Sequence, residues 1–163
     1  MQDATSAAVG QTSAATLGAN TVDSYVPSAA MGDMFEIESS KIAMEKSTNA
    51  DVKALAEMIT TDHTASTAML KQRAPAEAPN VAIPTALDQR RMGMLDNLRA
   101  ASAADFDRVY LDQQIAAHNE ALTLHRGFSD HTETPQLAAL AREVVPKIEM
   151  HLQRAQELRN AMN

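Results

Sequence analysis

The chain has 163 residues, a length that fits one domain with a sizeable buried core. A formal net charge of −7 without a basic stripe argues against nucleic acid as a partner, and no basic cluster suits an anionic lipid surface. The chain has no cysteine, which excludes a disulfide framework and a thiolate metal site, and no apolar run approaches the roughly 20 residues of a membrane span.

The composition is that of a helical protein. Alanine, leucine and methionine are plentiful, whereas the chain has five glycines, no tryptophan and 3% aromatic residues. Such a balance favours helices over sheets, so we predict an all-α fold.

The first twenty residues, MQDATSAAVGQTSAATLGAN, are small, polar and nearly uncharged. They lack the basic and apolar regions of a signal peptide. We interpret residues 1–20 as a flexible polar tail that remains after a signal peptide has been removed, which predicts a periplasmic or cell-envelope location. A disordered tail on a cytosolic protein is the alternative. Residues 21–163 are predicted to form a single helical-bundle domain.

Five helical segments are predicted after this tail. The first has Thr21 or Asn20 as its cap, and the last has Thr134 as its cap and Pro135 in its first helical position. The closely spaced prolines of RAPAEAPNVAIPTA prevent a continuous helix between the second and third segments. The predicted segments span about residues 22–47, 51–72, 87–100, 103–130 and 135–161.

The lengths of the connections predict how the helices are arranged. Short turns make the first and last pairs of long helices antiparallel hairpins, whereas roughly 30 residues with a short helix join the two hairpins. A connection of that length can cross the whole bundle, as in ferritin-like folds. We therefore predict a ferritin-like four-helix bundle, with a simple up-down-up-down bundle as the alternative.

Each long helix carries one ionisable residue at the centre of its apolar face. Residues placed at about 100° per step put Glu36, His63, His118 and His151 in these positions. With a rise of about 1.5 Å per residue, Glu36 and His63 lie level across the first turn, whereas His118 and His151 differ in height by roughly 7 Å. We therefore expect Glu36 to be the partner of His63.

Burying a charge or an unpaired imidazole is costly, so these inward residues need partners. In one arrangement, Glu36 and the three histidines bind one divalent transition metal ion (Zn, Cu or Fe), supported by Gln114, Tyr110 and His125. In the other, the carboxylate accepts hydrogen bonds from histidine or tyrosine and the network is structural.

Three stretches carry a resemblance to a known family. FEIESSKIAMEKSTNADVKALAEMITTDHT, YLDQQIAAHNEAL and IEMHLQRAQEL resemble the bacterial domain-of-unknown-function 4142 family, over about residues 22–158. The resemblance implies a ferritin-like helical bundle that is exported, of a kind often labelled an outer-membrane protein. The four inward residues fall at the characteristic Glu and His positions of that family, whereas His125 and His131 match no motif of it. The family name carries no established chemistry.

The ligand pattern of a di-iron bundle is missing. Such bundles place a glutamate three residues before a ligating histidine, but Ile115 and Ile148 occupy those positions here. Asp62 directly precedes His63 and is expected to point elsewhere. One metal ion is therefore the most that the pattern offers, and a metal-dependent redox enzyme is the least favoured function.

The function favoured by the sequence is a non-enzymatic binding or stress-related role with an unknown envelope partner. The Glu/His cluster would then hold the core of the bundle together, and no catalytic residue is assigned. A mononuclear metal-binding protein is the alternative. Since four-helix bundles often associate through their outer faces, a homo-oligomer also stays open.

Overall fold

The computed structural model describes residues 2–162, and every regular element among them is a helix. The predicted all-α fold is confirmed. The elements are α1 (Gln2–Ser13), the π-helical turn η1 (Ala14–Gly18), α2 (Val22–Lys46), α3 (Ala50–Glu77), α4 (Gln89–Ala100), α5 (Phe106–Phe128) and α6 (Pro135–Asn160). No helix in this described part of the chain is long and apolar enough to cross a membrane.

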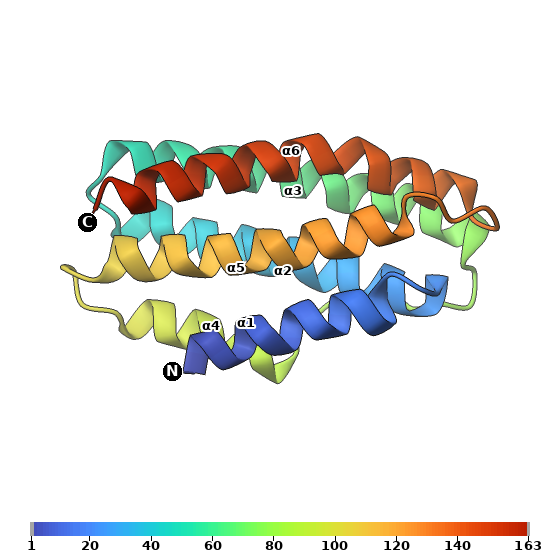
Figure 1. The fold of residues 1–163 in the computed structure, drawn as a ribbon, viewed down its shortest axis with the longest axis horizontal. Coiled ribbons are helices and arrows are strands. Elements are labelled where there is room, and N and C mark those ends of the chain that lie inside the picture. The colour runs from blue at the N-terminus through green and yellow to red at the C-terminus, as the bar shows by residue number, and fades with distance from the viewer. Residues whose placement is uncertain (1, 163) are drawn as a thin grey trace.

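The four long helices form a bundle. α2 packs against α3 and α5, and α6 packs against α5 and α3. In Figure 1, α2 and α3 run in opposite directions, as do α5 and α6. Residues 78–105, which include α4, return along the bundle, so that α5 begins at the end where α2 finishes. The chain therefore forms two antiparallel hairpins joined by one long connection.

Short polar residues fix where three of the helices begin. Thr21, Asn49 and Asp88 occupy the N-cap positions of α2, α3 and α4, and each side chain accepts a hydrogen bond from a backbone N–H of the first turn. These bonds satisfy donors that have no partner within the helix. α6 begins as predicted, with Thr134 at the cap position and Pro135 as the first helical residue.

α3 is longer than the sequence predicts. It continues through Pro75 to Glu77, whereas the proline-rich segment was expected to end the helix near Gln72. A proline this close to a helix end removes only one backbone bond. The last turn is closed by a hydrogen bond of 2.7 Å from the Ala78 N–H to the Ala74 carbonyl, and both alanines are buried.

The flexible tail expected over residues 1–20 is instead helical in its described part. α1 packs against α5, while η1 packs against both α2 and α5. Ala14 and Ala19 are buried, and the Arg90 guanidinium donates a hydrogen bond of 2.9 Å to the Ser6 carbonyl. Most side chains of this segment are small and uncharged, so the segment can pack closely against α2 and α5. The predicted boundary of the bundle domain at residue 21 remains a prediction.

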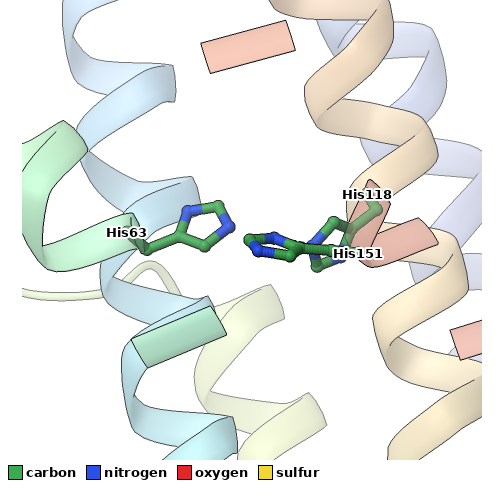
Figure 2. Close-up of side chains that lie close together, drawn as sticks. All are labelled: His63, His118 and His151. Atoms are coloured by element: carbon green, nitrogen blue, oxygen red, sulfur yellow. The ribbon is translucent and has the colours of Figure 1, made fainter. Parts of the chain in front are cut away.

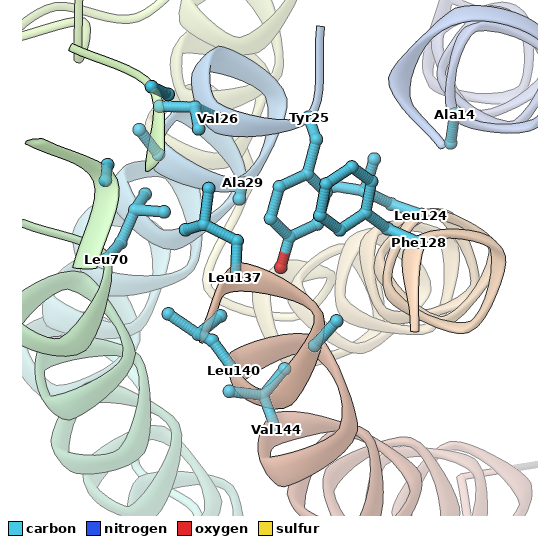
Figure 3. Packing of buried hydrophobic residues seen from close by; sticks show 14 of the residues in the cluster. Ala14, Tyr25, Val26, Ala29, Leu70, Leu124, Phe128, Leu137, Leu140 and Val144 are labelled. Carbon is cyan, nitrogen blue, oxygen red and sulfur yellow. The ribbon is translucent and has the colours of Figure 1, made fainter. Parts of the chain in front are cut away.

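The apolar interior is divided into two clusters. The first, here called the Tyr25 core, includes Tyr25, Val26, Leu70, Phe128, Leu137 and Leu140 (Figure 3). The second, here called the Phe35 core, includes Phe35, Leu55, Ile59, Leu98, Phe106 and Leu111. On α3, α5 and α6 a buried histidine lies in sequence between the last residue of one core and the first of the other. A polar layer therefore separates the two cores.

Candidate metal centre

Three buried histidines meet in this polar layer. His63 comes from α3, His118 from α5 and His151 from α6, and the exposed fractions of the three residues are 6%, 0% and 0%. One ring nitrogen of each can be chosen so that all three lie within 4.8 Å of one another. Figure 2 shows the three imidazoles reaching from their helices toward one another. The His118 Nε2 and the His151 Nδ1 are 3.3 Å apart.

The outward nitrogen of each ring lies against an oxygen atom. His63 Nδ1 is 2.8 Å from an Asp33 carboxylate oxygen, and His118 Nδ1 is 2.9 Å from the Gln114 backbone carbonyl. His151 Nε2 is 3.0 Å from an Asp62 carboxylate oxygen. Carbonyl and carboxylate oxygens accept hydrogen bonds, so each outward nitrogen donates and carries the proton.

The inward nitrogens therefore present lone pairs. His63 Nε2 is buried and has no hydrogen-bond partner among the described residues. His118 Nε2 and His151 Nδ1 face each other with no proton left for a hydrogen bond when both rings are neutral. Lone pairs held together in this way are stabilised by a proton, a hydrogen-bond donor or a metal ion between them. Rings oriented by outer oxygen acceptors are the usual form of histidine metal ligands.

The electrostatics leave two of the three rings neutral. Burial lowers the pKa of His118 well below its ordinary value, and neighbouring His63 and His151 lower it further. Burial also lowers the pKa of His151 to about 4, although Asp62 partly opposes this. His63 differs: burial lowers its pKa, but the hydrogen bond to Asp33 and the negative charges of the nearby carboxylates together outweigh burial and raise it. Without a metal ion, His63 is therefore the ring that takes up a proton first.

Asp62 links the cluster to the surface of the bundle. One of its carboxylate oxygens accepts the proton of His151, and the other lies 2.5 Å from the Lys147 ammonium group. Burial opposes the charge on Asp62, but the hydrogen bonds from Lys147 and His151 outweigh it and lower the pKa of Asp62. The acceptor of His151 is therefore an ionised carboxylate at neutral pH.

The sequence of this chain matches a family profile over most of its length. Residues 7–158 match the profile described as "Domain of unknown function (DUF4142)". The chain belongs to the DUF4142 family. The resemblance seen in its three sequence stretches is confirmed, and the match also covers most of α1.

Two solved structures share the fold of this DUF4142 chain. "CopM in the Cu(II)-bound form" has a TM-score of 0.74 and 19% sequence identity, covering 86% of this chain and 97% of that one. "CopM in the Cu(I)-bound form" has a TM-score of 0.73 and 18% identity, covering 86% of this chain and 96% of that one. No curated protein sequence matches the chain. Identity at this level establishes similarity of fold.

Glu36 does not face the inward nitrogens of the three clustered histidines. One of its carboxylate oxygens is 3.4 Å from His118 Nδ1, the nitrogen that faces away from His151. The other, Oε2, is buried without a hydrogen-bond partner, and burial raises the pKa of Glu36 to about 8. The structure thus brings together three of the four predicted ligands and places the fourth beside the outer edge of His118.

The predicted partner of His63 was wrong, since Asp33 and not Glu36 accepts its proton. α2 ends at Lys46 and α3 begins at Ala50, so the turn is centred between Ser47 and Asn49, equally far along the chain from Asp33 and His63. Glu36 lies one helical turn from Asp33 on the same face of α2, so a small error in the height comparison was enough to select Glu36 as the partner.

Asp62 was expected to point elsewhere, which was also wrong. It lies about 100° from His63 around α3 and faces α6, which packs along that side of α3. The height difference of roughly 7 Å expected between His118 and His151 is absent as well. In Figure 1, α6 begins beyond the end of α5, so residues 129–134 shift α6 along the bundle axis and bring His151 level with His118.

The three predicted supporting residues have different positions. Gln114 supplies the carbonyl that orients His118, and its side-chain amide donates to the Ser39 hydroxyl at 3.0 Å. Tyr110 pairs with the Ser40 hydroxyl at 2.9 Å. His125 Nδ1 is 2.9 Å from the Tyr25 hydroxyl, and the His125 ring lines the space beside His63. Of the three, Gln114 is the one that is hydrogen-bonded to a histidine of the cluster.

Proposed function

We propose that this DUF4142 protein binds a single transition metal ion through His63 Nε2, His118 Nε2 and His151 Nδ1. The observation that carries the proposal is the convergence of three buried lone pairs, each on a ring whose other nitrogen is held by an oxygen acceptor. Neutral imidazole is an ordinary ligand of zinc, copper, iron and nickel. A metal ion would also supply the partner that His63 Nε2 lacks.

A purely structural network accounts for less of this geometry. Without a metal ion the first proton is bound by His63 Nε2, which has no hydrogen-bond partner among residues 2–162, and His118 Nε2 and His151 Nδ1 keep their facing lone pairs. An unpaired buried polar atom costs about 1–3 kcal/mol, which a metal ion would avoid at all three rings together. The role proposed here is therefore metal binding, with no enzymatic step assigned.

Copper is the first ion to test. The two solved structures with this fold are named for their Cu(II)-bound and Cu(I)-bound forms. Three histidine nitrogens accept either copper oxidation state, and they also suit zinc. The ligand set of this chain is defined by its own residues, because the shared fold says nothing about which side chains bind.

The test is metal binding by protein purified without a histidine tag and freed of metal. We expect one Cu(II) per chain by calorimetry, with nitrogen donors in its electron paramagnetic resonance spectrum. His63→Ala and His151→Ala should each lower the affinity at least about a hundredfold, because each removes one of three ligands. His131→Ala is the matched control, since His131 stacks on Phe128 away from the cluster. Stoichiometric binding that survives both cluster substitutions would overturn the proposal, as would no binding of copper or zinc.

A further inference from the structure

A small cavity adjoins the histidine cluster between α2, α4 and α5. It has a volume of about 30 Å³, and Asp33, Glu36 and His63 form part of its wall. A water molecule needs at least about 10–15 Å³ of such space, so the cavity has room for about two waters or one ligand of two or three atoms. The cavity is thus large enough for a ligand and too small for a substrate of ordinary size.

The cavity exists because its wall is built from small residues. Gly32 lies in the interior of α2, where glycine is less favourable than alanine. A Cβ atom at Gly32 would meet nothing within 4 Å, and no described glycine has a positive φ. Neither close packing nor backbone conformation therefore requires glycine here. Ala117 and Ala121 of α5 continue the same small-residue wall.

Two unpartnered polar atoms lie in residues that line this cavity. They are Glu36 Oε2 and His63 Nε2, which come from different helices. The exposed fractions of Glu36 and His63 are 2% and 6%, so bulk water does not satisfy these atoms. Natural interiors pair nearly all such groups with protein or with a bound ligand. With the metal ion as the partner of His63 Nε2, the cavity is where a partner for Glu36 Oε2 would fit.

An ionic cluster forms part of the cavity wall. Arg90 and Arg91 of α4 lie 2.9 Å and 2.7 Å from the same oxygen of Glu120 on α5. All three residues line the cavity and are mostly buried. These ion pairs tie α4 to α5 beside the cavity, so the cavity is a built feature of the fold.

We propose that this cavity holds a small exchangeable ligand in the remaining coordination position of the metal ion at the three histidines. Water is the resting occupant, hydrogen-bonded to Glu36 Oε2, and a small anion of the size of azide can replace it. This inference rests on the proposed function, because the ligand binds to the metal. Three neutral imidazoles carry no charge of their own, so the ion can still accept an anion as its next ligand.

Azide titration of the Cu(II)-loaded protein tests the inference. We expect one azide per copper, seen as a new charge-transfer band and a shift in the electron paramagnetic resonance spectrum. Gly32→Leu should fill the cavity from α2 and weaken azide binding at least tenfold while copper stoichiometry is kept. Ala121→Leu does the same from α5, so the result does not depend on one variant. Gly32→Ala is the graded control, which adds one carbon and should weaken azide binding less.

The possible results separate the two claims. Copper binding without any spectral response to azide would overturn the inference and leave the proposed function intact. The inference would also fail if both filled variants bound azide with the affinity of the unchanged protein. Absence of copper binding in the unchanged protein would overturn the proposed function and the inference together.

Discussion

His63 and Asp33 face each other across the α2–α3 hairpin, with 2.8 Å between the imidazole Nδ1 and the carboxylate Oδ1. Both side chains are buried, and Thr67 donates a hydrogen bond of 3.2 Å to the second carboxylate oxygen. The carboxylate therefore holds the ring in one orientation, with Nε2 turned inward. Such outer carboxylates also make a histidine a stronger metal ligand.

Replacing Asp33 with asparagine should weaken metal binding by about 10–100-fold, because the neutral amide orients the His63 ring less firmly. Competition with a chelator measures the change in Cu(II) affinity. Glu38→Gln is the matched control, since Glu38 is exposed and pairs with Lys41 on the outer face of α2. An affinity in Asp33→Asn equal to that of the control would contradict the assigned role of Asp33.

The metal-free protein should lose stability as the pH falls from about 6.5 toward 4. Burial lowers the pKa of His125 from 6.5 to about 4, and the same direction holds for His118 and His151. Between these pH values the three histidines are protonated in the unfolded chain but stay neutral in the folded protein. Lowering the pH therefore favours unfolding. His63 and Glu36 act in the opposite sense because the pKa of each is raised, so the stabilising proton of each is bound at low pH and lost as the pH rises through the raised value.

His125→Gln measures the contribution of His125 to this pH dependence. The variant should have a shallower pH dependence of its urea midpoint between pH 6.5 and 4, because one depressed pKa is gone. Near neutral pH it should be about 1–2 kcal/mol less stable, since the hydrogen bond from Tyr25 to His125 is lost or weakened. His131→Gln, outside the cluster, is the comparison. A pH profile of His125→Gln that parallels that of the unchanged protein would refute the assignment.

The sequence was informative where one helix alone decides a position. His63, His118 and His151 each lie at the centre of an apolar face, and helical periodicity is enough to find them. Asp33 and Asp62 were missed because a carboxylate on a helix usually belongs to the solvated face. Whether these carboxylates face inward depends on which other helix packs beside α2 or α3. The apolar pattern of one helix does not contain that information. Asp33 precedes Glu36 by one turn on the same face of α2, and that spacing was the available signal.

The positions of the histidines along the bundle axis, and the helical structure of the N-terminal segment, also depend on how the helices pack together. Residues 129–134 set how far α6 is shifted along the bundle axis relative to α5, and this shift cannot be predicted from their sequence. Residues 2–18 have little apolar bulk, so their helix is stabilised by contact with α2 and α5 and not by a strong hydrophobic pattern of its own.

Gly32→Ala should stabilise the metal-free protein by about 0.5–1 kcal/mol in urea unfolding. Alanine is the better helix former, and its Cβ atom would meet nothing within 4 Å. Gly127→Ala is the opposite case, because its Cβ atom would lie 2.5 Å from the Ala19 side chain. That variant should be destabilised even though the change in helix propensity is the same. Equal effects of the two substitutions would show that the space around Gly32 is filled.

Removal of residues 1–19 tests whether the N-terminal segment is part of the folded bundle. The truncated chain should unfold at lower urea concentration, with a loss of about 1–3 kcal/mol, because Ala14 and Ala19 are buried and their neighbours on α5 become exposed. Arg90→Gln in the full chain removes the bond to the Ser6 carbonyl and the ion pair with Glu120, but it leaves the buried contacts of the segment in place and should cost less. If the segment were a flexible tail, its removal would leave both the midpoint and the slope of the unfolding curve unchanged, since no buried surface would be lost.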